Sequence, residues 1–149
     1  MPRRELSKPQ QIIDWLVEWG AALDEPASMT LIGSAGLLWH AGRLGLDVSL
    51  PENSMDVDPV TESDALAWMC YDALIGSEFE RQRGWHVNLL PRSVLDELPA
   101  NWRDRALSAH YARLELIVPS VADLLAPKLR RGEPRDRAHA AWAKLQGLI

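Results

Sequence analysis

The spacing of hydrophobic and polar residues predicts helices and strands that alternate along the chain. Apolar residues recur every three or four positions between Pro9 and Gly20, which is the period of an amphipathic helix. Residues 29–32 form a short apolar run typical of a buried strand. Residues 54–60 alternate polar and apolar side chains, as a half-buried strand does. We also expect helices over 35–43, 64–75, 121–131 and 135–145, a strand over 85–90, and one or two strands within 106–118.

This order of elements predicts an α/β or α+β protein with a sheet flanked by helices. The length of 149 residues is typical of one domain, so we expect a single domain over residues 1–149. We divide it into an N-terminal helix and loop (1–28), a sheet core (29–118) and C-terminal helices (119–149). The chain contains no internal repeat, low-complexity tract or linker.

Composition narrows the class of protein. The net charge of −5 disfavours a chain that binds nucleic acid over its whole surface, although basic residues gather near the C-terminus: Lys128, Arg130, Arg131, Arg135 and Arg137. No apolar run reaches the ~20 residues that span a bilayer, and the N-terminus does not have the pattern of a signal peptide. With the single cysteine, Cys70, these features predict a cytoplasmic protein without a membrane partner. We expect Cys70 and most of the seven tryptophans to be buried.

Two carboxylates, Asp56 and Asp58, are separated by one residue. On a strand, such residues point to the same face. Their mutual repulsion would be relieved by a divalent cation, and Mg²⁺ prefers oxygen ligands. Asp-x-Asp is a short pattern, however, and a solvated strand face with two surface acids is the more frequent explanation when the pattern stands alone.

Gly33 and Ser34 lie where a predicted strand ends and a helix begins. Glycine allows a tight turn and a close approach to a ligand. The N-terminus of a helix has free backbone N–H groups and a positive dipole end, which favour phosphate, and Ser34 could donate its hydroxyl. The simpler alternative is a plain turn in which Ser34 is the N-cap of the helix.

Together, these elements resemble the DNA polymerase β-like nucleotidyltransferase superfamily. In its members, a strand, a Gly-Ser or Gly-Gly turn and a helix precede a strand carrying Asp-x-Asp, with a hydroxyl residue just before it, here Ser54. Residues 118–129 and 131–136 resemble a lysine-bearing helix, here with Lys128, and the turn that follows. The resemblance covers roughly residues 29–145. It points to a branch of bacterial proteins related to abortive-infection and toxin–antitoxin nucleotidyltransferases.

The resemblance implies the nucleotidyltransferase fold, a small mixed sheet flanked by helices with a C-terminal helical pair. It implies metal-dependent transfer of a nucleotidyl group from a nucleoside triphosphate to a hydroxyl of a protein, an RNA or a small molecule. Mg²⁺ or Mn²⁺ would be held by Asp56 and Asp58. The nucleotide would be bound by Gly33, Ser34, Ser54 and Lys128.

The chain departs from this pattern at the third carboxylate, which active members usually carry on a later strand. The residue that we align there is Asn88, which has no negative charge and is no useful base. His86 could substitute as the base, although a half-exposed strand residue is the more frequent outcome. Asp64, Glu62 or Glu115 could also fill the position.

These observations leave two functions open. The first is an active nucleotidyltransferase. The second, motivated by Asn88, is a catalytically impaired relative that binds a nucleotide or a protein partner, in a toxin–antitoxin or phage-defence pair. A homodimer whose site is completed by the partner chain is a further alternative. Lys128 could face the phosphates, be solvated, or pair with Asp123 or Asp136.

Overall fold

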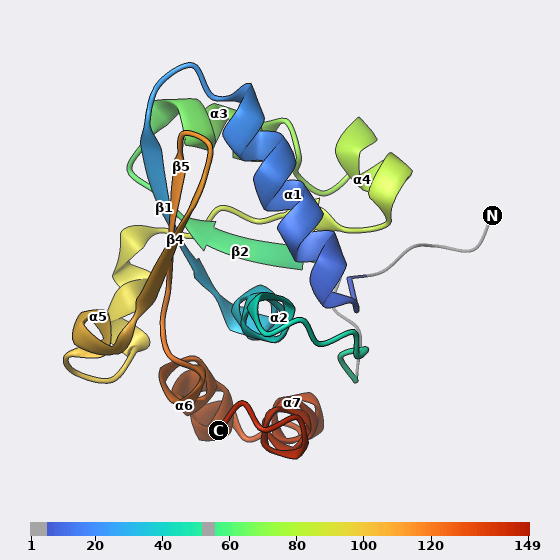
Figure 1. Cartoon of the computed structure of the whole chain (residues 1–149), viewed down its shortest axis with the longest axis vertical. Helices are drawn as coiled ribbons and strands as arrows, with labels where there is room; N and C mark the ends of the chain where they lie inside the picture. Colours follow the sequence, from blue (N-terminus) through green and yellow to red (C-terminus); the bar gives the residue numbers. More distant parts are fainter. Residues whose placement is uncertain (1–5, 52–55) are drawn as a thin grey trace.

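The structure, a computed structural model, describes residues 6–51 and 56–149. It contains one five-stranded sheet and helices on both of its faces (Figure 1). The elements in chain order are α1 (Pro9–Ala22), β1 (Ala27–Ile32), α2 (Gly33–Arg43), β2 (Asp56–Val60), α3 (Asp64–Tyr71), α4 (Glu78–Arg83), β3 (His86–Val87), η1 (Arg92–Glu97), α5 (Trp102–Arg105), β4 (Leu107–Tyr111), β5 (Leu114–Val118), α6 (Val121–Arg131) and α7 (Pro134–Leu145).

The sheet has the strand order β3-β2-β1-β5-β4, so β1 lies at its centre. β1 is antiparallel to β2 and parallel to β5, while β2 and β3 are parallel and β4 and β5 form an antiparallel hairpin. In the first pairing, Ile32 lies opposite Asp58. The end of β1, where the chain turns into α2, therefore lies beside the start of β2, where the two carboxylates are.

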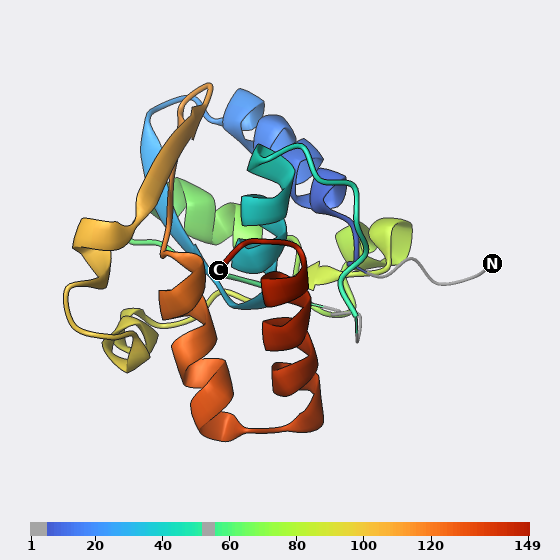
Figure 2. The same cartoon turned by 60° about the horizontal axis from the view of Figure 1, so that its bottom comes forward.

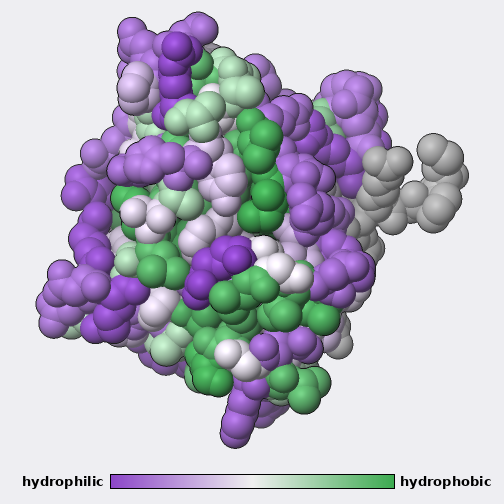
Figure 3. Space-filling model, viewed as in Figure 1, coloured by the Kyte–Doolittle hydropathy of each residue, from purple (hydrophilic) through white to green (hydrophobic). Residues whose placement is uncertain are grey.

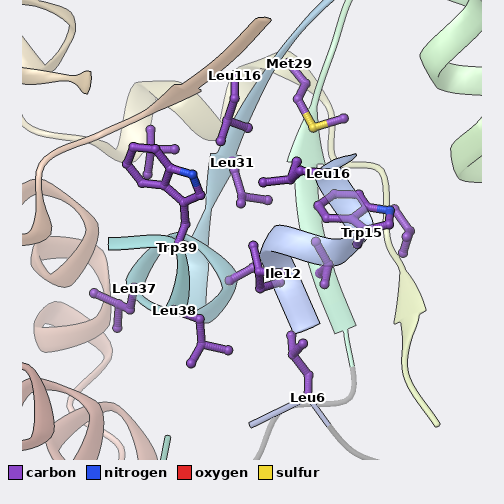
Figure 4. Packing of buried hydrophobic residues seen from close by; sticks show 14 of the residues in the cluster. Leu6, Ile12, Trp15, Leu16, Met29, Leu31, Leu37, Leu38, Trp39 and Leu116 are labelled. Atoms are coloured by element: carbon purple, nitrogen blue, oxygen red, sulfur yellow. The ribbon is translucent and has the colours of Figure 1, made fainter. Parts of the chain in front are cut away.

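One face of the sheet carries the main hydrophobic core. Side chains alternate along β1, and Met29 and Leu31 point into this core, where they meet α1 and α2. Figure 4 shows Ile12 and Leu16 of α1 close to Leu31. Burial of such side chains contributes about 1.5 to 3 kcal/mol each, which makes this layer the main source of stability.

The other face of the sheet is covered by η1 and α5. A smaller cluster forms there between Val60 of β2 and the buried side chains Leu95, Leu98 and Trp102. Ile32 of β1 packs against the same cluster. η1 thus lies over the end of β1 and over β2, the strand that carries the two carboxylates.

The C-terminal helices α6 and α7 form a hairpin that packs on α2 (Figure 2). α6 begins at the N-cap Ser120, whose hydroxyl accepts the backbone N–H of Asp123. Where α6 meets α2, a Cβ atom on Gly36 would lie 2.9 Å from a methyl carbon of Leu124, so glycine permits this close approach. Hydrophobic residues gather over the lower part of the surface in Figure 3, the region of α6 and α7 in the same view of Figure 1.

The mixed α/β architecture and the C-terminal helical pair agree with the sequence prediction, as do the positions of α1, α2, α6 and α7. Residues 106–118 form two strands, β4 and β5. The expected strand over 85–90 is regular only at His86–Val87, although the backbone N–H groups of Asn88 and Leu90 continue to bond to β2 at the carbonyls of Val57 and Pro59. Of the expected strand over 54–60, residues 56–60 are described and form β2.

The predicted end of the helix over 64–75 was wrong, because α3 ends at Tyr71 and a separate helix, α4, follows. α4 begins at Ser77, whose hydroxyl accepts the backbone N–H of Glu80. It contains no buried residue, so it has no hydrophobic period that could have predicted it.

The burial expected for Cys70 and for most of the tryptophans is confirmed. Cys70 is fully buried, and burial raises the pKa of its thiol to about 12. Six of the seven tryptophans are buried, and only Trp68 is exposed, at 69%. Within residues 6–51 and 56–149, no helix is long and apolar enough to cross a membrane.

Candidate functional site

A cavity of about 230 Å³ lies where the start of α2, the start of β2, η1 and the α6–α7 hairpin meet. It combines acidic, basic and hydroxyl side chains with an apolar wall. Its lining residues are Ile32, Gly33, Ser34, Asp56, Asp58, Leu90, Val94, Glu97, Leu98, Leu124, Pro127, Lys128, Arg131 and Arg135.

The turn at Gly33 brings the N-terminus of α2 to this cavity. Gly33 has a φ angle of 70°, in the left-handed region that glycine adopts without strain. A Cβ atom at this position would lie 3.3 Å from Oδ2 of Asp58, a tight contact that the carboxylate would have to relieve by a small shift. The N-cap is Ile32, whose side chain cannot accept a hydrogen bond, and the first N–H groups of α2 are not capped by it. An anion in the cavity could therefore bind to them.

Asp56 and Asp58 project from β2 into the cavity, and both are half-buried. The pKa of Asp58 is raised from its usual value to about 6, first by burial and second by the negative charge of Asp56. The nearby Asn88, Lys128 and His86 act in the opposite direction but do not offset the rise. Asp56 and Asp58 are therefore not two solvated acids on an exposed strand face, the alternative considered from the sequence. The site instead concentrates negative charge where it is poorly hydrated.

Asn88 lies beside the carboxylate pair. Its Nδ2 donates a hydrogen bond to Oδ1 of Asp58, 3.4 Å away. The position that we align with the third carboxylate is thus adjacent to the first two, although Asn88 does not line the cavity. His86 is held by Glu80, with Nδ1 2.7 Å from Oε2, and it does not line the cavity either. This position does not support the use of His86 as a substitute base.

Lys128 reaches the cavity from α6. Its side chain is buried, with Nζ 3.3 Å from Oγ of Ser34, 3.1 Å from Nδ1 of His139 and 3.8 Å from Oδ1 of Asp136. Burial lowers the pKa of Lys128 to about 8, and the opposing charge of Asp136 limits the change. The solvated alternative for this lysine is therefore wrong, and Asp123 is not its partner, because that carboxylate pairs with Arg105.

Two arginines complete the basic side of the cavity. Arg131 donates to Oδ1 of Asp136 at 2.8 Å, and Arg135 lines the cavity from the first turn of α7. Burial alone would raise the pKa of Asp136, but the hydrogen bond from Arg131 and the charges of Arg131 and Lys128 hold it below its usual value. Asp136 is thus ionised and forms ion pairs with two of the three basic residues of the cavity, Arg131 and Lys128.

The structure brings together most of the residues selected from the sequence. Gly33, Ser34, Asp56, Asp58 and Lys128 line one cavity, and Asn88 adjoins it. Ser54 lies outside the described residues. Ser34 is not the N-cap, since α2 begins one residue earlier.

The other candidate carboxylates lie elsewhere. Glu62 pairs with Arg92, and Glu115 contacts Ser28 and lies 3.6 Å from His110. Asp64 is exposed at the start of α3. None of the three lines the cavity.

Sequence reasoning missed Glu97 and His139. Glu97 enters from η1, which had no predictable hydrophobic period. His139 follows Asp136 by three residues on one helix, a spacing that places both on one face. That spacing was the available signal, but it gains meaning only when Lys128 is known to be their neighbour.

The cavity places groups of opposite charge on facing sides. Oxygen ligands are on the β2 side, cations are on the α6–α7 side, and the N-terminus of α2 lies between them. Comparisons with protein-family models, curated proteins and solved structures found no match.

Proposed function

We propose that this chain has the nucleotidyltransferase fold and transfers a nucleotidyl group from a nucleoside triphosphate to a hydroxyl acceptor, with Mg²⁺ or Mn²⁺. The observation that carries this proposal is the meeting, in one cavity, of the Asp56–Asp58 pair, the glycine turn at the start of α2 and Lys128. The resemblance of the sequence to the superfamily supports the same function.

The carboxylate pair fits a divalent cation. Both side chains offer oxygen ligands, and the raised pKa of Asp58 reflects burial and a repulsion that a cation would relieve. Among the described residues, no group of three or more His, Cys, Asp or Glu side chains could hold a metal ion. Asp56 and Asp58 would therefore share the ion with substrate phosphates and water, as is usual for Mg²⁺. The ion would neutralise charge on the transferring group.

The other residues of the cavity act on the phosphates. The first N–H groups of α2 and the hydroxyl of Ser34 would donate to phosphate oxygens. Lys128, Arg131 and Arg135 would balance the charge of the triphosphate and of the leaving pyrophosphate. In the reaction, the acceptor oxygen bonds to the α-phosphorus, the bond to pyrophosphate breaks, and the acceptor proton passes to solvent or to a base.

Calorimetric titration with each nucleoside triphosphate, with and without Mg²⁺, tests this function. We expect metal-dependent binding in the wild type that disappears in the double variant Asp56→Asn, Asp58→Asn. The matched control is Asp24→Asn, which removes an exposed carboxylate from the loop before β1 and should bind normally. Transfer of label from an α-³²P nucleotide to protein, RNA or small-molecule acceptors then measures turnover. Transfer that is unchanged in a folded Asp56→Ala variant would refute the assignment.

Asn88 favours a second candidate function. Its amide donates to Asp58 where an active member would carry a carboxylate, so the site has one negative charge less and no base at this position. The chain would then be a nucleotide-binding or partner-binding relative, in a toxin–antitoxin or phage-defence pair. Metal-dependent nucleotide binding without any transfer would favour this second function, and measurable turnover by the isolated chain would exclude it.

A further inference from the structure

His139 is buried next to the cavity and does not line it. It lies on α7 with no exposed surface. Its Nδ1 atom is 3.1 Å from Nζ of Lys128 and 3.4 Å from Oγ of Ser34, and its Nε2 atom is 3.0 Å from the carbonyl oxygen of Pro51. The ring therefore connects the cavity, on one side, with the loop that precedes β2, on the other.

The partners of the ring determine its tautomer. A carbonyl oxygen only accepts, so the Nε2 atom must carry a hydrogen in order to bond to Pro51. An ammonium group only donates, so the Nδ1 atom must offer its lone pair to Lys128. A ring with its hydrogen on Nε2 and a lone pair on Nδ1 satisfies both of these hydrogen bonds.

The ammonium group of Lys128 is held in three directions. It has three hydrogens, and its three neighbours are Nδ1 of His139, Oγ of Ser34 and Oδ1 of Asp136. A lysine side chain is flexible and gives little directional control by itself. Asp136 supplies charge but is the most distant of the three, at 3.8 Å. The shortest of the three contacts is the one to His139.

We propose that His139 is a positioning residue, which accepts a hydrogen bond from Lys128 and so holds the ammonium group against the turn at Ser34. The proposal rests on the proposed function for the ligand, a triphosphate, but the contact between the two side chains exists without it. His139 does not touch the substrate, so it acts only through Lys128.

This arrangement also orients Ser34. Its oxygen accepts from Lys128, and the lone pair of Nδ1 is taken by the closer ammonium group. The hydroxyl hydrogen of Ser34 is then left to donate to a phosphate oxygen in the cavity. One histidine thus prepares two donors, the hydroxyl and the ammonium group, for the same anion.

The two ring nitrogens have separate tasks, so two substitutions can separate them. In His139→Asn, the side-chain oxygen takes the place of Nδ1, which keeps the acceptor for Lys128 and loses the bond to Pro51. In His139→Gln, the amide nitrogen takes the place of Nε2, which keeps the bond to Pro51 and loses the acceptor. A purely structural role, as a tie to the loop, predicts the opposite order of effects.

The first measurement needs neither a variant nor a ligand. The ¹⁵N shifts of the His139 ring in the wild type should show a neutral ring protonated at Nε2, and the Lys128 ammonium group should give a slowly exchanging ¹⁵N signal. A ring protonated at Nδ1, or a rapidly exchanging Lys128 in the folded wild type, would overturn the proposal.

The second measurement compares the variants. The Lys128 signal should persist in His139→Asn and be lost in His139→Gln. The Kd for a nucleoside triphosphate with Mg²⁺ should rise about tenfold in His139→Gln, which is the loss expected for one hydrogen bond to a charged group. In His139→Asn the Kd should rise much less. Equal Kd values in the two variants, with both folded by urea unfolding, would show that His139 does not position Lys128.

Failure of the proposed function would look different. In that case the wild type binds no nucleoside triphosphate, whereas the ring tautomer and the Lys128 signal are still measurable. Those two signals then decide whether His139 holds Lys128.

Discussion

Replacing Asp58 with asparagine should stabilise the protein in the absence of metal. Asparagine has nearly the shape of aspartic acid and keeps an oxygen that can accept from Asn88. It removes the charge that burial and Asp56 make unfavourable. A residue that has a purely structural role would lose stability on this change, whereas a residue retained for ligand binding should gain it.

The size of the gain follows from the pKa. The rise from 3.8 to about 6 corresponds to about 3 kcal/mol, at about 1.4 kcal/mol for each pH unit. Because the folded state holds the proton more tightly than the unfolded state, this contribution favours folding below pH 3.8 and is lost as the pH rises through about 6. About half of this stabilising contribution is already lost at pH 5. The Asp58→Asn variant lacks this titration.

Urea unfolding between pH 4.5 and 7.5, with a chelator present, measures the effect. The difference between Asp58→Asn and the wild type should grow with pH and reach about 2 to 3 kcal/mol near pH 7. The control Asp24→Asn, at an exposed position, should stay within about 0.5 kcal/mol at every pH. Added Mg²⁺ should then stabilise the wild type and leave Asp58→Asn unchanged.

Two results would refute this reasoning. A variant that is less stable than the wild type at pH 7 would mean that the Asp58 carboxylate is well compensated by its neighbours. A gain that does not change with pH would mean that it comes from something other than the charge.

Three further substitutions probe the same cavity. Gly33→Ala should lower the free energy of unfolding by about 1 to 2 kcal/mol in urea unfolding, because alanine strains the positive φ angle, and a fully stable variant would contradict this conformation. Arg135→Ala should raise the Kd for a nucleoside triphosphate about tenfold in calorimetry, because it removes a cation from the cavity. The control Arg137→Ala, at an exposed position on the same helix, should leave the Kd unchanged. Equal effects of the two substitutions would exclude a specific role of Arg135 in binding the triphosphate. Asn88→Asp should tighten Mg²⁺ binding in calorimetry and lower stability without metal, because it adds a charge beside Asp58; unchanged metal affinity would argue against that placement.

The elements that local sequence patterns encode could be predicted. α1 and α6 each carry an apolar stripe and a recognisable start, Pro9 in the first case and Ser120 in the second. The buried part of β1, residues 29–31, could be recognised because this strand lies in the centre of the sheet and carries the apolar side chains of Met29 and Leu31. α4 and η1 could not be predicted in the same way, since few or none of their side chains enter the core.

The candidate site also has one part that the sequence could predict and one part that it could not. Gly33 and the Asp56–Asp58 pair were identified because their spacing has a local physical meaning. Their distance from Lys128 could not be derived from spacing, because it depends on how the α6–α7 hairpin packs on α2. Glu97 and His139 lie beside the cavity because of the same long-range packing, so the spacing of Asp136 and His139 on one helix face could not identify the site by itself.

The pairing at the centre of the sheet has a consequence for how the protein folds. β1 bonds to β5, and the contact between Ser28 and Glu115 joins residues 87 positions apart. The contact between Ser34 and His139 joins residues 105 positions apart. Such distant pairings slow folding, because the chain must close a long loop before they can form. On the ribosome, the N-terminal half therefore waits for β5 to complete its sheet. The cavity is assembled last, when the helices that carry Lys128 and His139 have been synthesised.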